Sequence, residues 1–206
     1  SLFTLTVTPP FNVTVFQPNV TIGRGATTAA GFSITITPLA GFNGMVTVDV
    51  AGLPPGTTKN SPLSINVPGT PVSVGPTVTS SQSTPLGTYP LTVTATSGSA
   101  LNTVAVSLTV ADFSLSVTAI SPIANLGASA TFKLTINATP SFPDAINIGV
   151  GGTPNAPFNI QLSNPSPLPP GSSTTITILN VNGLPGTYPL TVQGSGLGLT
   201  RTAVVP

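Results

Sequence analysis

The charged residues are the first place to look for chemistry, because the 206-residue chain contains no histidine and no cysteine. There are seven of them: Asp49, Asp112, Asp144, Arg24, Lys59, Lys133 and Arg201. General acid–base catalysis needs a group that titrates near neutral pH or two carboxylates held at a set distance. A serine nucleophile would have to rely on Lys59 or Lys133 in a desolvated pocket, and neither lies in a recognisable motif. We therefore expect no enzymatic activity and no cofactor.

Two of these residues have a sharper alternative role. Lys133 lies between apolar Phe132 and Leu134, which predicts a solvated lysine; the alternative is a covalent amide bond to an asparagine beside a buried acid. Asp112 could bind calcium, but calcium prefers six to eight oxygen ligands with several carboxylates, and no second acid is near it in the sequence. A turn or hinge role for Asp112 is the simpler interpretation, and we expect no metal.

The composition excludes several classes of partner. Only 3% of residues are charged, the net charge is +1 and the basic residues are scattered, so nucleic acid and anionic lipid are not expected ligands. Threonine, serine, glycine or proline interrupts every apolar run, which excludes a membrane-spanning helix and membrane insertion. With 39% hydrophobic residues, the chain should nevertheless bury a core.

An internal repeat divides the chain in two. Residues 85–93 recur almost unchanged as 184–192, residues 32–36 match 132–136, and residues 3–8 match 113–118. The sequence therefore predicts two copies of one domain, residues 1–111 and 112–206.

Each copy has the pattern of an all-β domain. Short alternating runs are separated by clusters of glycine, proline, asparagine and serine at the spacing of a β-sandwich, and no segment has helical periodicity. Residues two apart in a strand share a face, so the inward residues of two strands should be Phe32, Ile34 and Ile36, and Val46, Val48 and Val50.

The order of these motifs, including Gly-Leu-Pro-Pro-Gly at 52–56 and Gly-Thr-Tyr-Pro-Leu-Thr-Val at 87–93, resembles bacterial immunoglobulin-like repeats that occur in tandem on exported prokaryotic proteins. The resemblance implies two tandem immunoglobulin-like antiparallel β-sandwich domains and an extracellular or cell-surface location. Residues 151–154 are a degraded form of the glycine-proline motif in the second copy. Because one fold hosts many functions, the resemblance does not define the task.

Two kinds of surface residue follow from this interpretation. Tyr89 and Tyr188 stand where such sandwiches keep a tyrosine whose hydroxyl bonds back to the backbone, so we expect them to be structural. Three sequons make Asn12, Asn19 and Asn137 candidate glycosylation sites, with chance occurrence in a threonine-rich chain as the alternative.

The two copies are unequal at their ends. The first has about ten extra residues before Phe32, including the alternating run 11–16, and the last strand of the second is about three residues shorter. A strand from another molecule could supply the missing backbone partners. The candidate donor residues are Phe3, Leu5, Val7, Phe11, Val13 and Val15, and the candidate acceptor edge is Thr202, Val204 and Val205. The alternative is that the chain was cut at a boundary.

These observations favour a structural protomer of an extracellular filament, sheath or surface layer, which self-associates into a homopolymer by head-to-tail strand addition. Low surface charge fits a protomer whose outer face is packed against neighbours. The alternative is a stalk, spacer or adhesive module of a larger secreted or surface protein, including a carbohydrate-binding one, although a chain without tryptophan offers little for sugar stacking.

Overall fold

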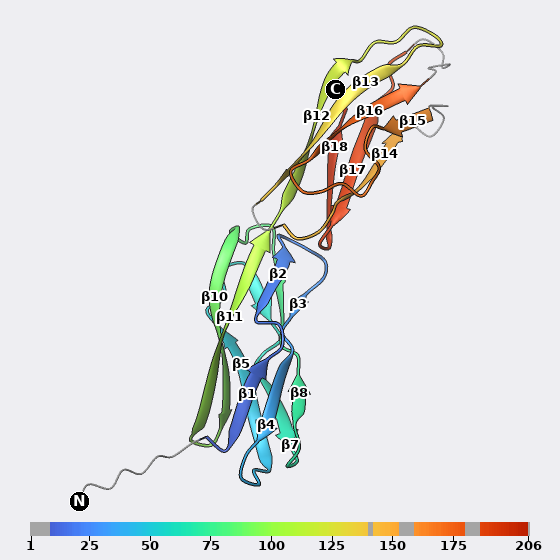
Figure 1. Ribbon diagram of the computed structural model, residues 1–206. Helices are drawn as coiled ribbons and strands as arrows, with labels where there is room; N and C mark the ends of the chain where they lie inside the picture. The colour runs from blue at the N-terminus through green and yellow to red at the C-terminus, as the bar shows by residue number, and fades with distance from the viewer. Residues whose placement is uncertain (1–8, 140–141, 153–158, 180–185, 206) are drawn as a thin grey trace, which may run out of the picture. The chain divides into compact units, whose positions relative to one another are not determined.

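β-Strands are the regular elements of the computed structural model, which describes residues 9–139, 142–152, 159–179 and 186–205. Its contacts divide the chain into unit 1, Ser1–Val110, and unit 2, Ala111–Pro206. Within the described ranges, no helix is long and apolar enough to cross a membrane. The predicted fold class is confirmed: both units are antiparallel immunoglobulin-like β-sandwiches (Figure 1).

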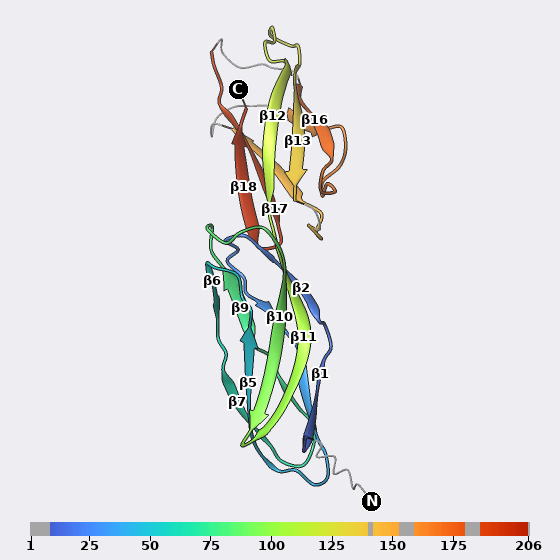
Figure 2. The ribbon, with the colours of Figure 1, turned by 90° about the vertical axis from the view of Figure 1, so that its left-hand side faces the viewer.

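Unit 1 is built from the first eleven strands of the chain. They are β1 (Phe11–Val15), β2 (Asn19–Gly23), β3 (Ala30–Gly31), β4 (Ile34–Pro38), β5 (Gly44–Ala51), β6 (Thr57–Lys59), β7 (Leu63–Val67), β8 (Val72–Val74), β9 (Thr77–Ser80), β10 (Gly87–Ser97) and β11 (Ala100–Ala111). One layer is a five-stranded sheet in the order β2-β11-β10-β5-β7. The other consists of β1-β4-β8, continued by β3-β9-β6, as the two views of the ribbon show (Figures 1 and 2).

The alternation of apolar and polar residues builds the core of unit 1. Successive strand residues point to opposite faces, so every second residue of β4 and β5 enters the space between the layers. The six residues predicted to face inward, in and before these strands, are all buried: Phe32, Ile34, Ile36, Val46, Val48 and Val50. Phe32 also joins the two parts of its layer, because its N–H donates to the Pro76 carbonyl at 3.0 Å between β3 and β4.

The chain of unit 1 crosses from one layer to the other between β1 and β2. Asn102 of β11 donates its side-chain amide to the Phe11 carbonyl, and Ser107 further along β11 donates its N–H to the Pro18 carbonyl. The first two strands therefore advance in the direction of β11, and Figure 1 shows the arrows of β2 and β11 pointing the same way. As a result, β2 covers the outer edge of β11.

Unit 2 contains the remaining strands. They are β12 (Phe113–Ser121), β13 (Ala130–Ala138), β14 (Asn147–Gly152), β15 (Asn159–Leu162), β16 (Ser173–Leu179), β17 (Leu190–Gly196) and β18 (Leu199–Val204). One layer has the order β12-β13-β16-β15 and the other the order β14-β17-β18. Its core includes Phe132, Leu134, Ile176 and Val192, which are all buried.

The register of the first strands corrects one sequence match. Phe11 pairs with Pro38 in β4, and Phe113 pairs with Ala138 in β13, which are matching positions of the two copies. The counterpart of Phe113 is therefore Phe11 and not Phe3. The sequence match was wrong because Phe-x-Leu-x-Val is a generic strand pattern that recurs at both places. β2 has no counterpart between the first two strands of unit 2, since β12 leads through a loop directly to β13.

Candidate functional site

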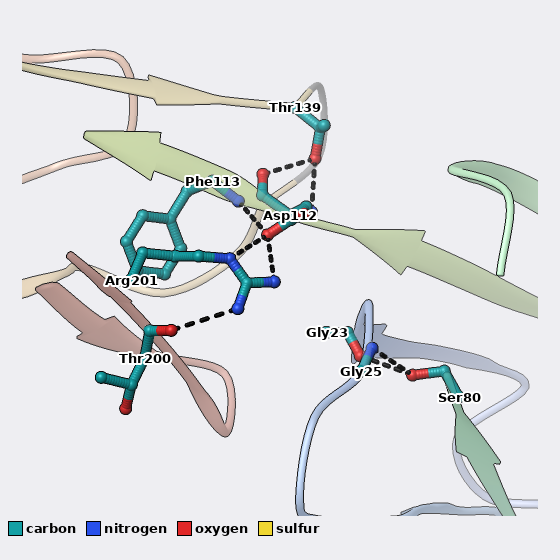
Figure 3. A network of polar contacts seen from close by, with 8 residues as sticks. All are labelled: Gly23, Gly25, Ser80, Asp112, Phe113, Thr139, Thr200 and Arg201. Carbon is teal, nitrogen blue, oxygen red and sulfur yellow. Dashed lines mark hydrogen bonds and ion pairs between the residues drawn. The ribbon is translucent and has the colours of Figure 1, made fainter. Parts of the chain in front are cut away.

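One polar cluster of unit 2 is centred on Asp112, which is buried. Its Oδ1 accepts hydrogen bonds from Arg201 Nη2 at 2.8 Å, Arg201 Nε at 3.1 Å and the Phe113 N–H at 2.8 Å (Figure 3). Arg201 in turn donates from Nη1 to the Thr200 carbonyl at 3.1 Å. The cluster joins the start of β12 to β18, so its arrangement is that of a structural ion pair.

Thr139 completes this cluster from the end of β13. Its hydroxyl accepts the Asp112 N–H at 2.9 Å and donates to the Asp112 carbonyl at 3.0 Å (Figure 3). Within the described residues, no three acids, histidines or cysteines gather where they could hold a metal ion. A calcium ion at Asp112 would therefore have no cluster of further acidic ligands among these residues.

The acid–base cluster of unit 1 lies on β5 and the segment after it. Asp49 Oδ1 accepts from Lys59 Nζ at 2.5 Å, from the Ser61 hydroxyl at 2.6 Å and from the Val50 N–H at 2.8 Å. Lys59 Nζ also donates to the Val50 carbonyl at 2.6 Å. Both Ser61 and Lys59 donate to the carboxylate, so the arrangement is that of a structural ion pair.

The surroundings of Asp49 shift its titration. Burial acts to raise the pKa of Asp49, but hydrogen bonds from Lys59, Ser61 and the Val50 N–H, with the positive charge of Lys59, outweigh it. The pKa of Asp49 is therefore lowered below its ordinary value. Its side chain is 41% exposed, so water screens the pair and its contribution to stability is small.

We expect Asp49→Asn to destabilise unit 1 only where the carboxylate is ionised. A folded-state pKa below the unfolded one means that the stabilisation is present above the unfolded pKa and is lost as pH falls through the folded pKa. The loss should be up to about 1 kcal/mol at neutral pH and should shrink as the pH falls through the folded-state pKa. Urea unfolding of both proteins at neutral pH and over a series of acidic pH values measures it; a difference that stays unchanged throughout would contradict the ion-pair interpretation.

The candidate covalent bond of Lys133 gains no support from the fold. Lys133 is exposed on β13 in unit 2, and Asp49 belongs to unit 1, where Lys59 is its partner. Sequence reasoning missed both ion pairs because each joins different strands. The scarcity of charge was the available signal: with three acids and four bases in 206 residues, each acid should be sought beside a base.

The candidate glycosylation sites all lie on strands with exposed side chains. Asn12 is on β1, Asn19 on β2 and Asn137 on β13. The Asn19 side-chain oxygen accepts from the Ser107 hydroxyl at 2.7 Å, and the Asn137 amide donates to the Ser116 hydroxyl at 3.3 Å. Glycosylation at these three residues stays a prediction.

Tyr89 has the geometry of a structural tyrosine. Its hydroxyl donates to the Pro85 carbonyl at 3.1 Å, four residues upstream. Tyr89 lies near the start of β10, before the residues of that strand that are buried in the core. Tyr188 is half-buried, and the residues matching Pro85 and Leu86 in its copy, 184 and 185, lie outside the described residues.

The six candidate donor residues fall into two groups. Phe3, Leu5 and Val7 lie outside the described residues. Phe11, Val13 and Val15 form β1 and pair with β4, and the side chains of Phe11 and Val13 are buried in the core of unit 1. The structure therefore uses the second group within its own unit, and only the first remains a candidate donor.

The candidate acceptor edge is the outer side of β18. The Val205 N–H donates to the Leu190 carbonyl, so alternate residues of an antiparallel strand place Val205 and Ala203 towards β17, and Thr202 and Val204 towards the outer edge. In the part of the chain that the structure describes, the sheet ends at β18. Thr202 and Val204 are thus edge residues, whereas Val205 is a core residue.

A short segment before β17 shows where unit 2 differs most from unit 1. Residues 186–189 repeat Gly-Thr-Tyr-Pro of 87–90 without change. In unit 1 this sequence is the beginning of β10 and pairs with residues 107–110 of β11. In unit 2 it lies outside every strand, and β17 begins only at Leu190.

The first strands of the two units are covered to a similar degree. Phe11 and its counterpart Phe113 are both buried, and Val15 and its counterpart Val117 are both half-buried. The middle pair differs, because Val13 is buried and Leu115 is half-buried. The larger difference between the units is therefore the strand pairing of 87–90, which 186–189 lack within the described residues.

Comparison with known proteins gives likenesses of fold. No family model and no curated protein matches the chain. Domains 5–6 of the S-layer protein SbsC match 96% of this chain and 97% of their own at 20% identity and a TM-score of 0.33. The fibronectin(III)-like modules of CbhA from Clostridium thermocellum match 94% and 92% at 12% identity and a TM-score of 0.34. A protein of unknown function from Porphyromonas gingivalis W83 matches 95% and 98% at 13% identity and a TM-score of 0.34. The role of this chain must follow from its own geometry.

Proposed function

We propose that the chain is a non-enzymatic structural protomer of an extracellular filament, sheath or surface layer, in which a strand from one copy completes unit 2 of the next. One observation carries the proposal: the same four residues form a paired strand at 87–90 and lie outside every strand at 186–189. Identical sequence excludes local propensity as the cause. The difference is the partner strand, which β11 supplies in unit 1.

The proposed donor is the segment 1–8 of a second copy. Phe3, Leu5 and Val7 alternate with polar residues, as Val106, Leu108 and Val110 do in β11. The donor takes the place of this second half of β11: it continues the line of β18, runs antiparallel to β17 and pairs with residues 186–189. Its three apolar side chains then extend the core beyond the buried Val205 and Leu190.

The free energy of the strand contact determines whether this contact alone can hold two copies together. Burying three large apolar side chains contributes about 5–9 kcal/mol, and each added backbone hydrogen bond about 1 kcal/mol. Association of two proteins costs about 4–15 kcal/mol. Since the two are similar in size, the strand alone gives a weak link, and a stable polymer requires further contact between the copies.

The composition supports a packed, exported assembly. A chain with 3% charged residues has little electrostatic protection against association, which suits a protomer whose outer face meets its neighbours. A homopolymer needs no nucleic acid, membrane insertion or cofactor, and glycans on Asn12, Asn19 and Asn137 would lie on exposed strand positions.

Electron microscopy of the purified chain tests the proposal, with a pair of adjacent substitutions. Wild type should form fibres with a fixed repeat. Leu5→Asp places a charge among the side chains that must enter unit 2 and should abolish the fibres. Thr6→Asp, which changes the next residue but faces outward in the alternating donor, should retain them.

Both variants should unfold in urea like the wild type, which separates loss of assembly from loss of folding. A wild-type chain that stays monomeric at high concentration would overturn the proposal and favour a spacer module. Fibres that persist in Leu5→Asp would reject segment 1–8 as the donor.

A further inference from the structure

The end of β12 and the loop that follows it in unit 2 expose three large aliphatic side chains. Ile120, Ile123 and Leu126 are 60%, 86% and 70% exposed within seven residues. No charged residue occurs between Asp112 and Lys133. Soluble proteins rarely expose large apolar side chains so close together unless they meet a partner. We name these three residues the apolar loop.

The apolar loop lies at the end of unit 2 that the proposed donor strand approaches. The bond from Arg201 to Asp112 places the start of β12 beside β18, and each strand leads away from this point towards the loop. At about 3.3 Å per residue, Ser121 is about 26 Å along β12 from Phe113, and Val205 about 13 Å along β18 from Arg201. A donor that continues β18 by about four residues reaches the level of the loop.

Unit 1 exposes apolar side chains where the donor segment joins it. The Leu39 N–H donates to the Pro10 carbonyl at 2.8 Å, and Asn102 donates to the Phe11 carbonyl at 3.3 Å. Leu39 and Leu101, beside these two contacts, are both exposed. No charged residue occurs from residue 1 to Arg24, or between Pro38 and Thr47. We name Leu39 and Leu101 the entry face of unit 1.

We propose that the apolar loop of one copy packs against the entry face of the next. The inference rests on the proposed function, because the donor strand fixes which ends meet. A donor that runs in the direction of β18 carries Pro9 and Pro10 to the loop end of unit 2, so the entry face of the incoming copy arrives beside the apolar loop. A donor running the opposite way would carry that face towards Arg201. Lys133 pairs with Thr118, two residues before Ile120, and the sequence around the entry face has no charged residue, so no like charges oppose the contact.

This contact also compensates for the weakness of the strand link. Burying the side chain of Ile120, Ile123 or Leu126 stabilises the junction by a free energy similar to that of burying one apolar residue of the donor strand. The two contacts form together, since inserting the strand pays the cost of association once for both. The apolar loop therefore converts a weak strand exchange into a stable junction.

Paired cysteines test the junction, because the wild-type chain has none. In the double variant Leu101→Cys with Leu126→Cys, a short bismaleimide should link successive copies into a ladder of dimers, trimers and larger species on a denaturing gel. Either single variant should give dimers at most. The control Leu86→Cys with Leu126→Cys also has an exposed cysteine in unit 1, but just before β10, at the opposite end of that strand from Leu101, which pairs with Thr96.

Three results are distinguishable. A ladder from the 101/126 pair at least tenfold more abundant than from the 86/126 pair supports the inference. Fibres seen by microscopy with equal ladders from both pairs would overturn the junction and leave strand addition standing. Chains that form neither fibres nor ladders would overturn both proposals.

Discussion

Phe32→Ala should lower the free energy of unfolding of unit 1 by about 3–5 kcal/mol, because it removes a buried aromatic ring and leaves a cavity that the layers cannot close. Phe32 is 1% exposed and lies between β3 and β4, where its backbone also bonds to Pro76. The neighbours that would have to collapse include Ile34 and Val78, which are themselves buried in strands paired on both sides. Hydrogen exchange of the β4 and β10 amides in urea measures the change.

Phe16→Ala is the matched control for this substitution. Phe16 is 83% exposed, directly after β1, so removing its ring leaves no cavity and should change the stability of unit 1 by less than about 0.5 kcal/mol. The exchange of unit 2 amides should be unchanged in both variants. Equal losses from the two phenylalanines would contradict the placement of the core.

The core could be predicted from the sequence because it depends on a local rule. Ile34, Ile36 and the valines of β5 face inward since residues two apart share a face, whatever the sheet order. The crossing of the chain at β2 could not be predicted in the same way. The alternation of 11–16 indicates a strand but does not say that it pairs with β4, nor that the chain then changes layer.

The candidate site shows more clearly what cannot be predicted from the sequence alone. Gly-Thr-Tyr-Pro occurs in both units, yet only the copy at 87–90 is a strand. Strand formation depends on a partner that contributes hydrogen bonds, and a partner is not encoded in the four residues themselves. The comparison of two identical segments in different surroundings shows that the partner strand makes the difference, since residues 87–90 pair with β11.

The two ion pairs also depend on the fold and could not be predicted from the sequence. Asp112 and Arg201 are 89 residues apart and meet because β12 and β18 lie at the same edge of unit 2. No spacing rule connects them. Asp49 and Lys59 are closer in sequence, but Lys59 lies on β6 in the opposite layer to β5, so only the sandwich brings the two side chains together.

Asp112→Ala should destabilise unit 2 by about 3 kcal/mol, the low end of the cost of breaking a buried ion pair. The substitution removes the acceptor for three hydrogen bonds and leaves the guanidinium of Arg201 without this carboxylate. The low end applies because the Arg201 side chain, at the edge of β18, keeps some contact with water. Hydrogen exchange of the β12 and β18 amides measures the loss.

Asp144→Ala removes a carboxylate of the same unit in a different setting. Asp144 is exposed and accepts the Leu197 N–H at 3.2 Å, so its loss should cost less than about 0.5 kcal/mol. Asp112→Asn keeps an oxygen acceptor and should fall between the two. Because Arg201 lies on the strand that the proposed donor extends, Asp112→Ala should also loosen β18 and reduce fibre formation. Asp144→Ala should do neither; if both variants behaved alike, the Asp112 cluster would have no special part in holding the acceptor strand.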